Sequence, residues 1–210
     1  MKKLFFMMML FFGLSVNAEA FEMTATLTAD NVFALYVGNE SGVSFVGSGN
    51  RWEQSRTFTF DADSEDYLYV AAWSDGAVAQ GLIGEFVSDS GVILTDTSNW
   101  EVYLTDHDLD VYDPAPSEAD IETDISMAMW EPIADSLDYG SSPWGSWCLA
   151  EISRDARWIW GSRLLGGSDY GEYQLFRTQV ESSATPEPAT MFLLGSGLIG
   201  LAGLGKRFKK

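Results

Sequence analysis

Short stretches in which apolar and polar residues alternate fill the middle of the chain. Residues 23–27 and 56–60 show alternation of polar and apolar residues, unbroken in 23–27 and from Thr57 onward in 56–60, which is the period of a β-strand with one buried face. Other runs are rich in β-branched and aromatic residues: 32–37, 67–73, 81–87, 100–104, 156–160 and 173–180. Turn-forming residues separate these runs. The pattern predicts an all-β fold, an antiparallel β-sandwich or barrel, and the polar residues 106–124 are expected to form a long loop or an insertion.

The first twenty residues have three parts. Lysines at positions 2 and 3 are followed by thirteen apolar residues and then by Asn17-Ala18-Glu19-Ala20. A buried core helix or a membrane anchor is an alternative, but thirteen residues fall short of the ~20 that span a bilayer. We therefore predict a signal peptide over residues 1–20, with Ala18 and Ala20 as the small residues before the cleavage site. The Sec translocon and signal peptidase would then be partners.

The other end of the sequence also has three parts. Pro186-Glu187-Pro188 precedes an uncharged, glycine-rich stretch over residues 189–205. This stretch is near the lower length limit of ~17 residues for a transmembrane helix. A basic cluster follows it, which the positive-inside rule would hold on the cytoplasmic side: Lys206, Arg207, Lys209 and Lys210. The sequence alone thus predicts one membrane helix, which could also be a tail anchor without processing.

This order of parts resembles the PEP-CTERM protein-sorting domain of Gram-negative bacteria over residues 184–210. The resemblance implies cleavage near Pro186-Glu187-Pro188 by an exosortase, a membrane transpeptidase-like enzyme. It also implies a precursor anchored transiently in the inner membrane through residues 189–205. The mature protein would then reach the cell surface or the medium, usually in organisms that make exopolysaccharide and biofilm.

Charge and composition exclude several classes of protein. The net charge of −19 includes six basic residues from the two ends. Residues 21–185 therefore carry six arginines, no lysine and 29 acidic residues, which is a net charge of −23. Such a surface repels the phosphates of nucleic acid, although divalent cations could bridge it to an acidic polysaccharide. A single Cys excludes an internal disulfide framework and a single His excludes a multi-histidine metal site.

A second resemblance concerns the predicted exported domain, residues 21–183. Residues 28–39, followed by Val46-Gly47 and Trp52, are similar to a stretch of the galactose-binding-like β-sandwiches. Residues 69–73 and 81–86 fit a later strand pair of that fold. The resemblance implies a jelly-roll sandwich, a fold that hosts many unrelated functions.

Tryptophan is the residue type most suggestive of sugar binding, because its flat face can stack on C–H bonds. Trp144 and Trp147 lie among prolines and glycines, where a loop would expose them as carbohydrate contacts. The alternative is that tryptophans fill the core. We expect core positions for Trp52, Trp73, Trp158 and Trp160.

An acidic run offers weak candidates for a structural calcium site: Asp106, Asp108, Asp110 and Asp113. Carboxylates at alternate positions on a loop can surround Ca²⁺, which takes six to eight oxygen ligands. The run lacks the central glycine and the final glutamate of an EF-hand. We favour a solvated acidic loop. The galactose-binding-like resemblance adds weight to calcium, because such domains often carry one; otherwise no cofactor is indicated.

Catalytic signatures are sparse. His107 is the only histidine and lies inside the acidic run, and no G-x-S-x-G motif surrounds a serine. We therefore predict a non-enzymatic protein with a structural or adhesive role at the cell surface or in the extracellular matrix, associated with exopolysaccharide. The alternative is a carbohydrate-binding module for the cell's own polysaccharide. A glycoside-active enzyme is the third class, because 29 acidic residues offer many carboxylate pairs.

Overall fold

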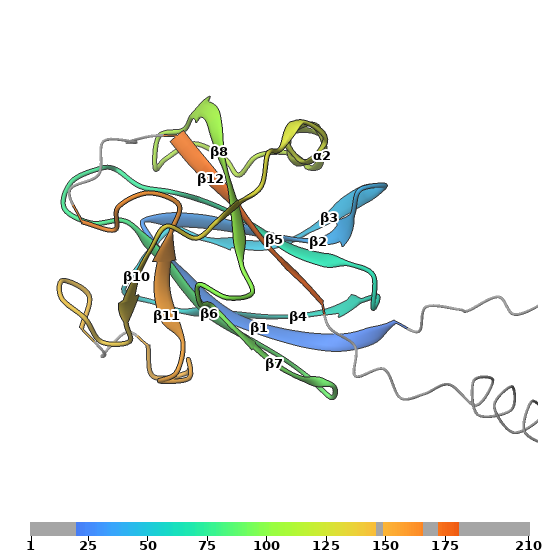
Figure 1. Ribbon diagram of the computed structural model, residues 1–210, viewed down its shortest axis with the longest axis horizontal. Helices are drawn as coiled ribbons and strands as arrows, with labels where there is room; N and C mark the ends of the chain where they lie inside the picture. Colours follow the sequence, from blue (N-terminus) through green and yellow to red (C-terminus); the bar gives the residue numbers. More distant parts are fainter. Residues whose placement is uncertain (1–19, 146–148, 166–171, 181–210) are drawn as a thin grey trace, which may run out of the picture.

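Two antiparallel β-sheets packed face to face form the protein (Figure 1). The computed structural model describes residues 20–145, 149–165 and 172–180. Within these residues each sheet has six strands, and every strand pair is antiparallel. The predicted all-β sandwich is therefore confirmed.

The first sheet, sheet A, has the strand order β10-β11-β6-β1-β4, with β7 also paired to β6. Its strands are β1 (Phe21–Asp30), β4 (Arg56–Ala62), β6 (Gly81–Ser88), β7 (Gly91–Leu94), β10 (Asp135–Asp138) and β11 (Arg157–Trp160). Strand β1 shows why the alternating pattern forms this sheet. Met23, Ala25 and Leu27 face the other sheet and are at most 1% exposed, whereas Thr24 lies on the opposite face beside Thr59 of β4.

The second sheet, sheet B, has the order β3-β2-β5-β12-β8-β9. Its strands are β2 (Val32–Asn39), β3 (Gly42–Gly49), β5 (Tyr67–Trp73), β8 (Glu101–Asp108), β9 (Glu131–Pro132) and β12 (Glu172–Gln179). Strands β2, β5 and β12 are buried on both faces along most of their length. Continuous apolar runs therefore mark β2 and β5 in the sequence, whereas polar residues interrupt the run in β12.

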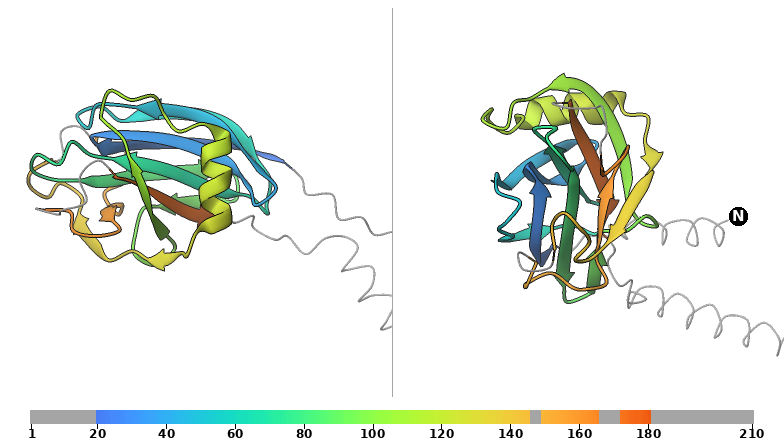
Figure 2. Two further views of the ribbon diagram at one scale, coloured as in Figure 1. Left: turned by 90° about the horizontal axis from the view of Figure 1, so that it is seen from above. Right: turned by 90° about the vertical axis from the view of Figure 1, so that its left-hand side faces the viewer.

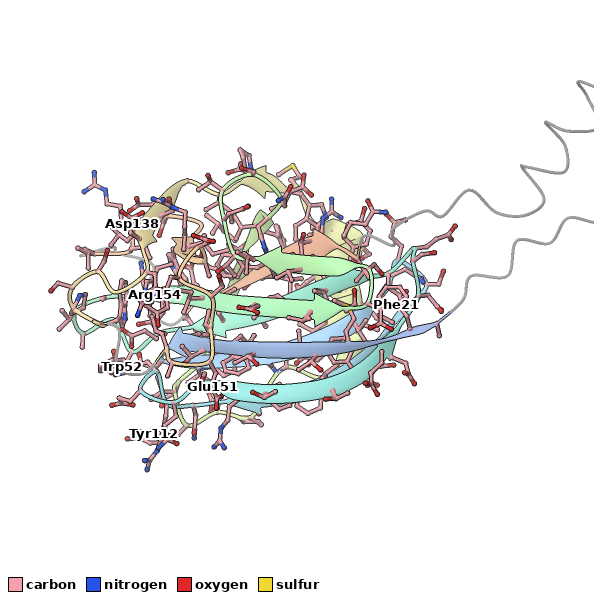
Figure 3. The ribbon with its side chains drawn as sticks, turned by 90° about the horizontal axis from the view of Figure 1, so that it is seen from below. Phe21, Trp52, Tyr112, Asp138, Glu151 and Arg154 are labelled. Carbon is pink, nitrogen blue, oxygen red and sulfur yellow. The ribbon has the colours of Figure 1, made fainter. Side chains whose placement is uncertain are left out.

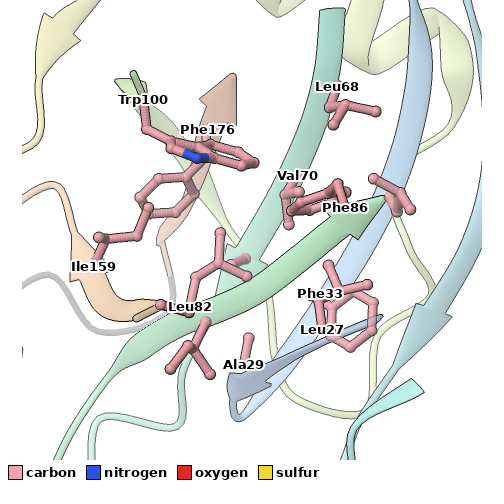
Figure 4. Packing of buried hydrophobic residues seen from close by; sticks show 14 of the residues in the cluster. Leu27, Ala29, Phe33, Leu68, Val70, Leu82, Phe86, Trp100, Ile159 and Phe176 are labelled. Atoms are coloured by element: carbon pink, nitrogen blue, oxygen red, sulfur yellow. The ribbon is translucent and has the colours of Figure 1, made fainter. Parts of the chain in front are cut away.

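The core between the sheets is apolar and rich in aromatic rings. Phe33, Val70 and Phe176 of sheet B meet Leu27 and Phe86 of sheet A (Figure 4). The expected core tryptophans are largely confirmed: Trp73, Trp158 and Trp160 are fully buried, and Trp52 is half-buried against the core.

A second apolar cluster lies on the outer face of sheet B. Residues 109–130, here called the cover segment, pack on it and contain helix α2 (Glu118–Met127). Figure 2 shows α2 crossing over the strands of this sheet. The cluster joins Tyr36, Tyr69 and Trp73 of the sheet to Ile121 of the helix.

The loop predicted over residues 106–124 is wrong in two places, because β8 extends to Asp108 and α2 begins at Glu118. A capping box starts the helix. The Ser117 hydroxyl accepts the N–H of Asp120 at 3.3 Å, and the Asp120 carboxylate accepts the N–H of Ser117 at 2.9 Å. Only Ile121 and Asp124 of α2 are buried. The helix therefore has no apolar stripe that periodicity could reveal.

Candidate functional site

The two ends of the sandwich differ in what they carry. Phe21 pairs with Ala62, and the N–H of Val180 donates to the carbonyl of Asp66 at 2.9 Å. The first described strand, β1, therefore begins at the same end of the sandwich at which the last one, β12, finishes. We call this end the terminal end. The opposite end, the loop end, carries residue 31 and loops 50–55 and 74–80. Figure 3 shows Trp52 and Tyr112 there, far from Phe21.

A hollow of about 460 Å³ opens at the loop end. Its lining combines amides, a guanidinium, a carboxylate and an indole: Asn31, Asn50, Arg51, Trp52, Glu53 and Gln54. Such a mixture can donate and accept hydrogen bonds along one short surface. The volume lies within the range of small-ligand pockets.

A second hollow, of about 340 Å³, shares Asn50 with the first. The end of β3, the start of β4 and the cover segment form its walls. Arg56 contributes a guanidinium, and Tyr112 is 93% exposed at its rim. An exposed tyrosine ring is a flat contact surface that costs little side-chain entropy to bind. We call the two together the joined hollows.

Hydrogen bonds hold the loops around the joined hollows. Thr28, which is 0% exposed, donates its hydroxyl to the carbonyl oxygens of Arg51 and Trp52 at 3.3 and 3.2 Å. The side-chain oxygen of Asn31 accepts from the Ser74 hydroxyl at 3.2 Å and from the N–H of Asp75 at 2.8 Å. Both loops are thus held in place before any ligand binds.

Beside the first hollow, Asp30 is buried and accepts the indole N–H of Trp144 at 2.8 Å. The pKa of Asp30 is raised to about 6, mainly by burial. The Trp144 hydrogen bond lowers this pKa, and the charges of Asp75 and Glu53 raise it. The exposure expected for Trp144 is wrong. Its side chain is 1% exposed and stacks on Trp158 at 4.2 Å, because a large ring gains more from core packing than from solvent. Trp147 lies outside the described residues.

The acidic run does not gather into a cation site. Within the described ranges, no group of three or more His, Cys, Asp or Glu side chains is arranged to hold a metal ion. Asp110 and Asp113 instead close a turn, in which the N–H of Asp110 donates to the Asp113 carboxylate at 2.8 Å. Asp106 and Asp108 lie on β8, where alternate residues share one face of the strand. The structure therefore gives no support to calcium at these four residues.

Sequence analysis missed one titratable cluster. His107 of β8 lies 3.4 Å from the buried carboxylate of Asp124 in α2, and Tyr173 of β12 donates its hydroxyl to that carboxylate. Burial raises the pKa of Asp124, while Tyr173 and His107 lower it. A hollow of about 360 Å³ lies beside this cluster. The three residues are far apart in sequence, and no spacing rule connects them.

A further concavity, of about 1020 Å³, lies near β10 and β11. Arg157 and Asp138 line it and form an ion pair with a distance of 2.6 Å. Its lining includes residues on both sides of 146–148 in the sequence, and these three lie outside the described residues. We therefore assign no ligand to it.

The fold and the loop-end hollows define an all-β sandwich with a polar concave surface. Residues 184–207 match the family model of the PEP-CTERM protein-sorting motif, so the chain carries this motif. The match includes Pro186-Glu187-Pro188, Lys206 and Arg207, and Lys209 and Lys210 follow it. The motif supports an exosortase-sorted secreted protein with a membrane-anchored bacterial precursor.

No curated protein and no solved structure matches the chain. The galactose-binding-like resemblance therefore stays a prediction. Among the described residues, no helix is long and apolar enough to cross a membrane. The predicted membrane helix at 189–205 lies outside that part of the chain, as does nearly all of the predicted signal peptide.

Proposed function

We propose that this protein has a structural or adhesive role at the cell surface or in the extracellular matrix, in association with exopolysaccharide. The observation that carries the proposal is the orientation of the sandwich relative to its sorting motif. Strand β12 finishes at the terminal end, and the motif begins at residue 184, so the precursor would hold the terminal end toward the membrane. The loop end, with its joined hollows, would then point away from the membrane toward matrix material.

Export by the Sec translocon and cleavage by signal peptidase after Ala20 are part of this proposal. Ala20 is exposed and directly precedes β1, so a cut at this position would leave the sheet intact. Intact-mass measurement of the secreted protein tests both ends. We expect a chain that begins at Phe21 and lacks the basic cluster. A secreted chain that retains Met1 and Lys210 would contradict the proposal.

The role itself is tested in the producing bacterium. Deleting the gene is expected to reduce matrix retention or cell-to-cell adhesion, and the full chain should restore it. A variant with Glu187→Ala is expected to stay in the membrane fraction, with adhesion still reduced. Normal adhesion in the deletion strain would overturn the proposed role.

We propose binding rather than catalysis as the activity. The acidic surface supports one mode of association, in which divalent cations bridge the domain to acidic polymer. Adding EDTA to matrix preparations should release the protein if bridging occurs.

Turnover of a reporter glycoside that one Asp or Glu substitution abolishes would replace this proposal with an enzymatic one. A carbohydrate-binding module is the second candidate, and the joined hollows favour it.

A further inference from the structure

Unused hydrogen-bonding groups gather in the joined hollows. No hydrogen bond or ion pair among the described residues involves the side chains of Asn50, Arg51, Glu53 or Gln54. Elsewhere in the described chain two arginines are paired, Arg157 with Asp138 and Arg177 with Glu101. The loop end therefore gathers in one place several polar side chains that the fold does not use internally.

The polar side chains of the joined hollows are of types that can hydrogen-bond to the hydroxyl groups of a ligand. An Asn or Gln amide offers both donors and an acceptor, and a sugar hydroxyl also does both. Asn50 and Gln54 supply such amides, and Arg51 adds donors in a planar fork. The exposed ring of Tyr112 supplies the apolar face on which a sugar ring can lie.

Rigidity makes this capacity useful for binding. The Thr28 hydroxyl holds the backbone of Arg51 and Trp52 from below, and the N–H of Gln54 donates to the carbonyl of Arg51 at 3.1 Å. A ligand would not need to order this loop, so little binding free energy is lost to entropy. A loop held in this way suits a preformed site.

The charges in the joined hollows favour an uncharged ligand. Arg51 and Arg56 are matched there by Glu53 and Asp113. A polyanion would gain no net local attraction and would face the net charge of −23 of the surrounding domain. A neutral chain experiences neither penalty. The two hollows share Asn50, so an extended ligand can occupy both at once.

We propose that the joined hollows bind a neutral, hydroxyl-rich polysaccharide chain, with Asn50, Arg51 and Gln54 hydrogen-bonding its hydroxyls and Tyr112 stacking on one sugar ring. This proposal rests on the proposed function and names the ligand class of its outward-facing end. Trp144, one of the two sugar contacts suggested by the sequence, lines neither hollow.

The test uses the secreted protein purified from its producing cells. Affinity electrophoresis would compare dextran and galactomannan, both neutral, with alginate, which is acidic, and with polysaccharide extracted from the same cells. We expect retardation by at least one neutral polymer. Gln54→Ala and Tyr112→Ala should each weaken that binding about tenfold, as for residues central to an interface.

Gln179→Ala is the matched control, because Gln179 is exposed at the terminal end of β12. It should bind like the unaltered protein, and all variants should keep the same melting temperature. Binding to alginate alone, binding to none of the polymers, or binding that Gln54→Ala and Tyr112→Ala leave unchanged would each overturn the proposal. Normal matrix retention of the Gln54→Ala strain would then show that the adhesive role stands without this site.

Discussion

The same three strands, β2, β5 and β12, build two clusters of different chemistry. Their inner faces contribute Phe33, Val70 and Phe176 to the core between the sheets. Their outer faces contribute Tyr36, Trp73 and Tyr173 to the cluster beneath the cover segment. The inner cluster is held by ring packing, as between Trp160 and Phe176 at 5.4 Å.

The outer cluster adds hydrogen bonds that all run in one direction. Tyr36 donates to the carbonyl of Pro116, Trp73 to the carbonyl of Asp110 at 3.1 Å, and Tyr173 to the carboxylate of Asp124. The sheet supplies donors and the cover segment supplies acceptors. An irregular segment leaves carbonyls unpaired, and aromatic residues with a polar atom can bury their rings while satisfying them. The difference teaches that the stability contributed by an inner side chain depends on its volume, whereas the stability contributed by an outer side chain depends on a single polar atom.

The largest effect should come from removing volume in the inner cluster. Phe176→Ala leaves a cavity where the ring is 0% exposed, and we expect a loss of about 3–5 kcal/mol in the free energy of unfolding. Chemical denaturation of the secreted protein measures it. Val92→Ala, at a residue 56% exposed on β7, should change stability little. Equal losses for both variants would contradict the division between core and surface.

The next effect concerns pH at the edge of the inner cluster. Because the pKa of Asp30 is about 6 in the folded state and near 3.8 when unfolded, the folded state binds the proton more tightly. This contribution to stability is full below pH 4 and is lost as the pH rises toward 6, by about 3 kcal/mol. Asp30→Asn should remove the decline in denaturation curves measured from pH 4 to 7.

The control for this pH effect is Asp89→Asn, on the exposed turn between β6 and β7. It should leave the pH profile of the unaltered protein in place. A profile that Asp30→Asn does not flatten would show that the Asp30 carboxyl is not buried as described.

In the outer cluster, removing one hydroxyl should matter without any loss of ring volume. Tyr173→Phe leaves the buried carboxylate of Asp124 without its hydroxyl donor, so we expect a loss of about 1.5–3 kcal/mol. Tyr36→Phe removes a bond to a neutral carbonyl and should cost about 0.5–1.5 kcal/mol. Denaturation of both variants gives the comparison. A larger loss of stability for Tyr36→Phe than for Tyr173→Phe would show that the charge of the acceptor does not determine the size of the effect.

The smallest effect should be local. Carboxylate oxygens of Glu118 and Glu122 in α2 accept the N–H groups of Phe45 and Val43, at 2.8 and 3.4 Å. These amides lie on the open edge of β3, which among the described strands pairs with β2 alone. Glu118→Ala should speed hydrogen exchange at Phe45 with little change in global stability.

The matched comparison is Glu122→Ala, which should affect Val43 rather than Phe45. Unchanged exchange at both amides would mean that α2 does not cap this edge. Exchange that increases throughout sheet B would show that the helix supports the whole outer cluster.

Patterns that are local in sequence were sufficient for much of the fold. The apolar run at 67–73 predicts β5 with its observed bounds, and the alternation at 23–27 predicts the centre of β1. The prediction missed β3, because glycines and serines interrupt its alternation. It missed α2 because four of its ten residues are acidic and only Ile121 and Asp124 are buried, so no apolar stripe marks the helix.

The candidate site was less accessible to sequence reasoning. Trp144 was chosen because prolines and glycines flank it, yet its ring is packed against Trp158 and bonded to Asp30. The residues of the joined hollows carry no motif, because their proximity comes from three separate connections at one end of the sandwich. Exposure depends on neighbours that are distant in the chain.

The sequence by itself determined the strand segments and the sorting motif, because both depend on the order and polarity of adjacent residues. Only the tertiary structure decided which aromatic rings are buried, that His107 and Tyr173 meet Asp124, and that Asn50 joins two hollows. The physical reason is that burial and hydrogen-bond geometry arise from contacts between segments that sheet pairing brings together, and no local pattern encodes that pairing.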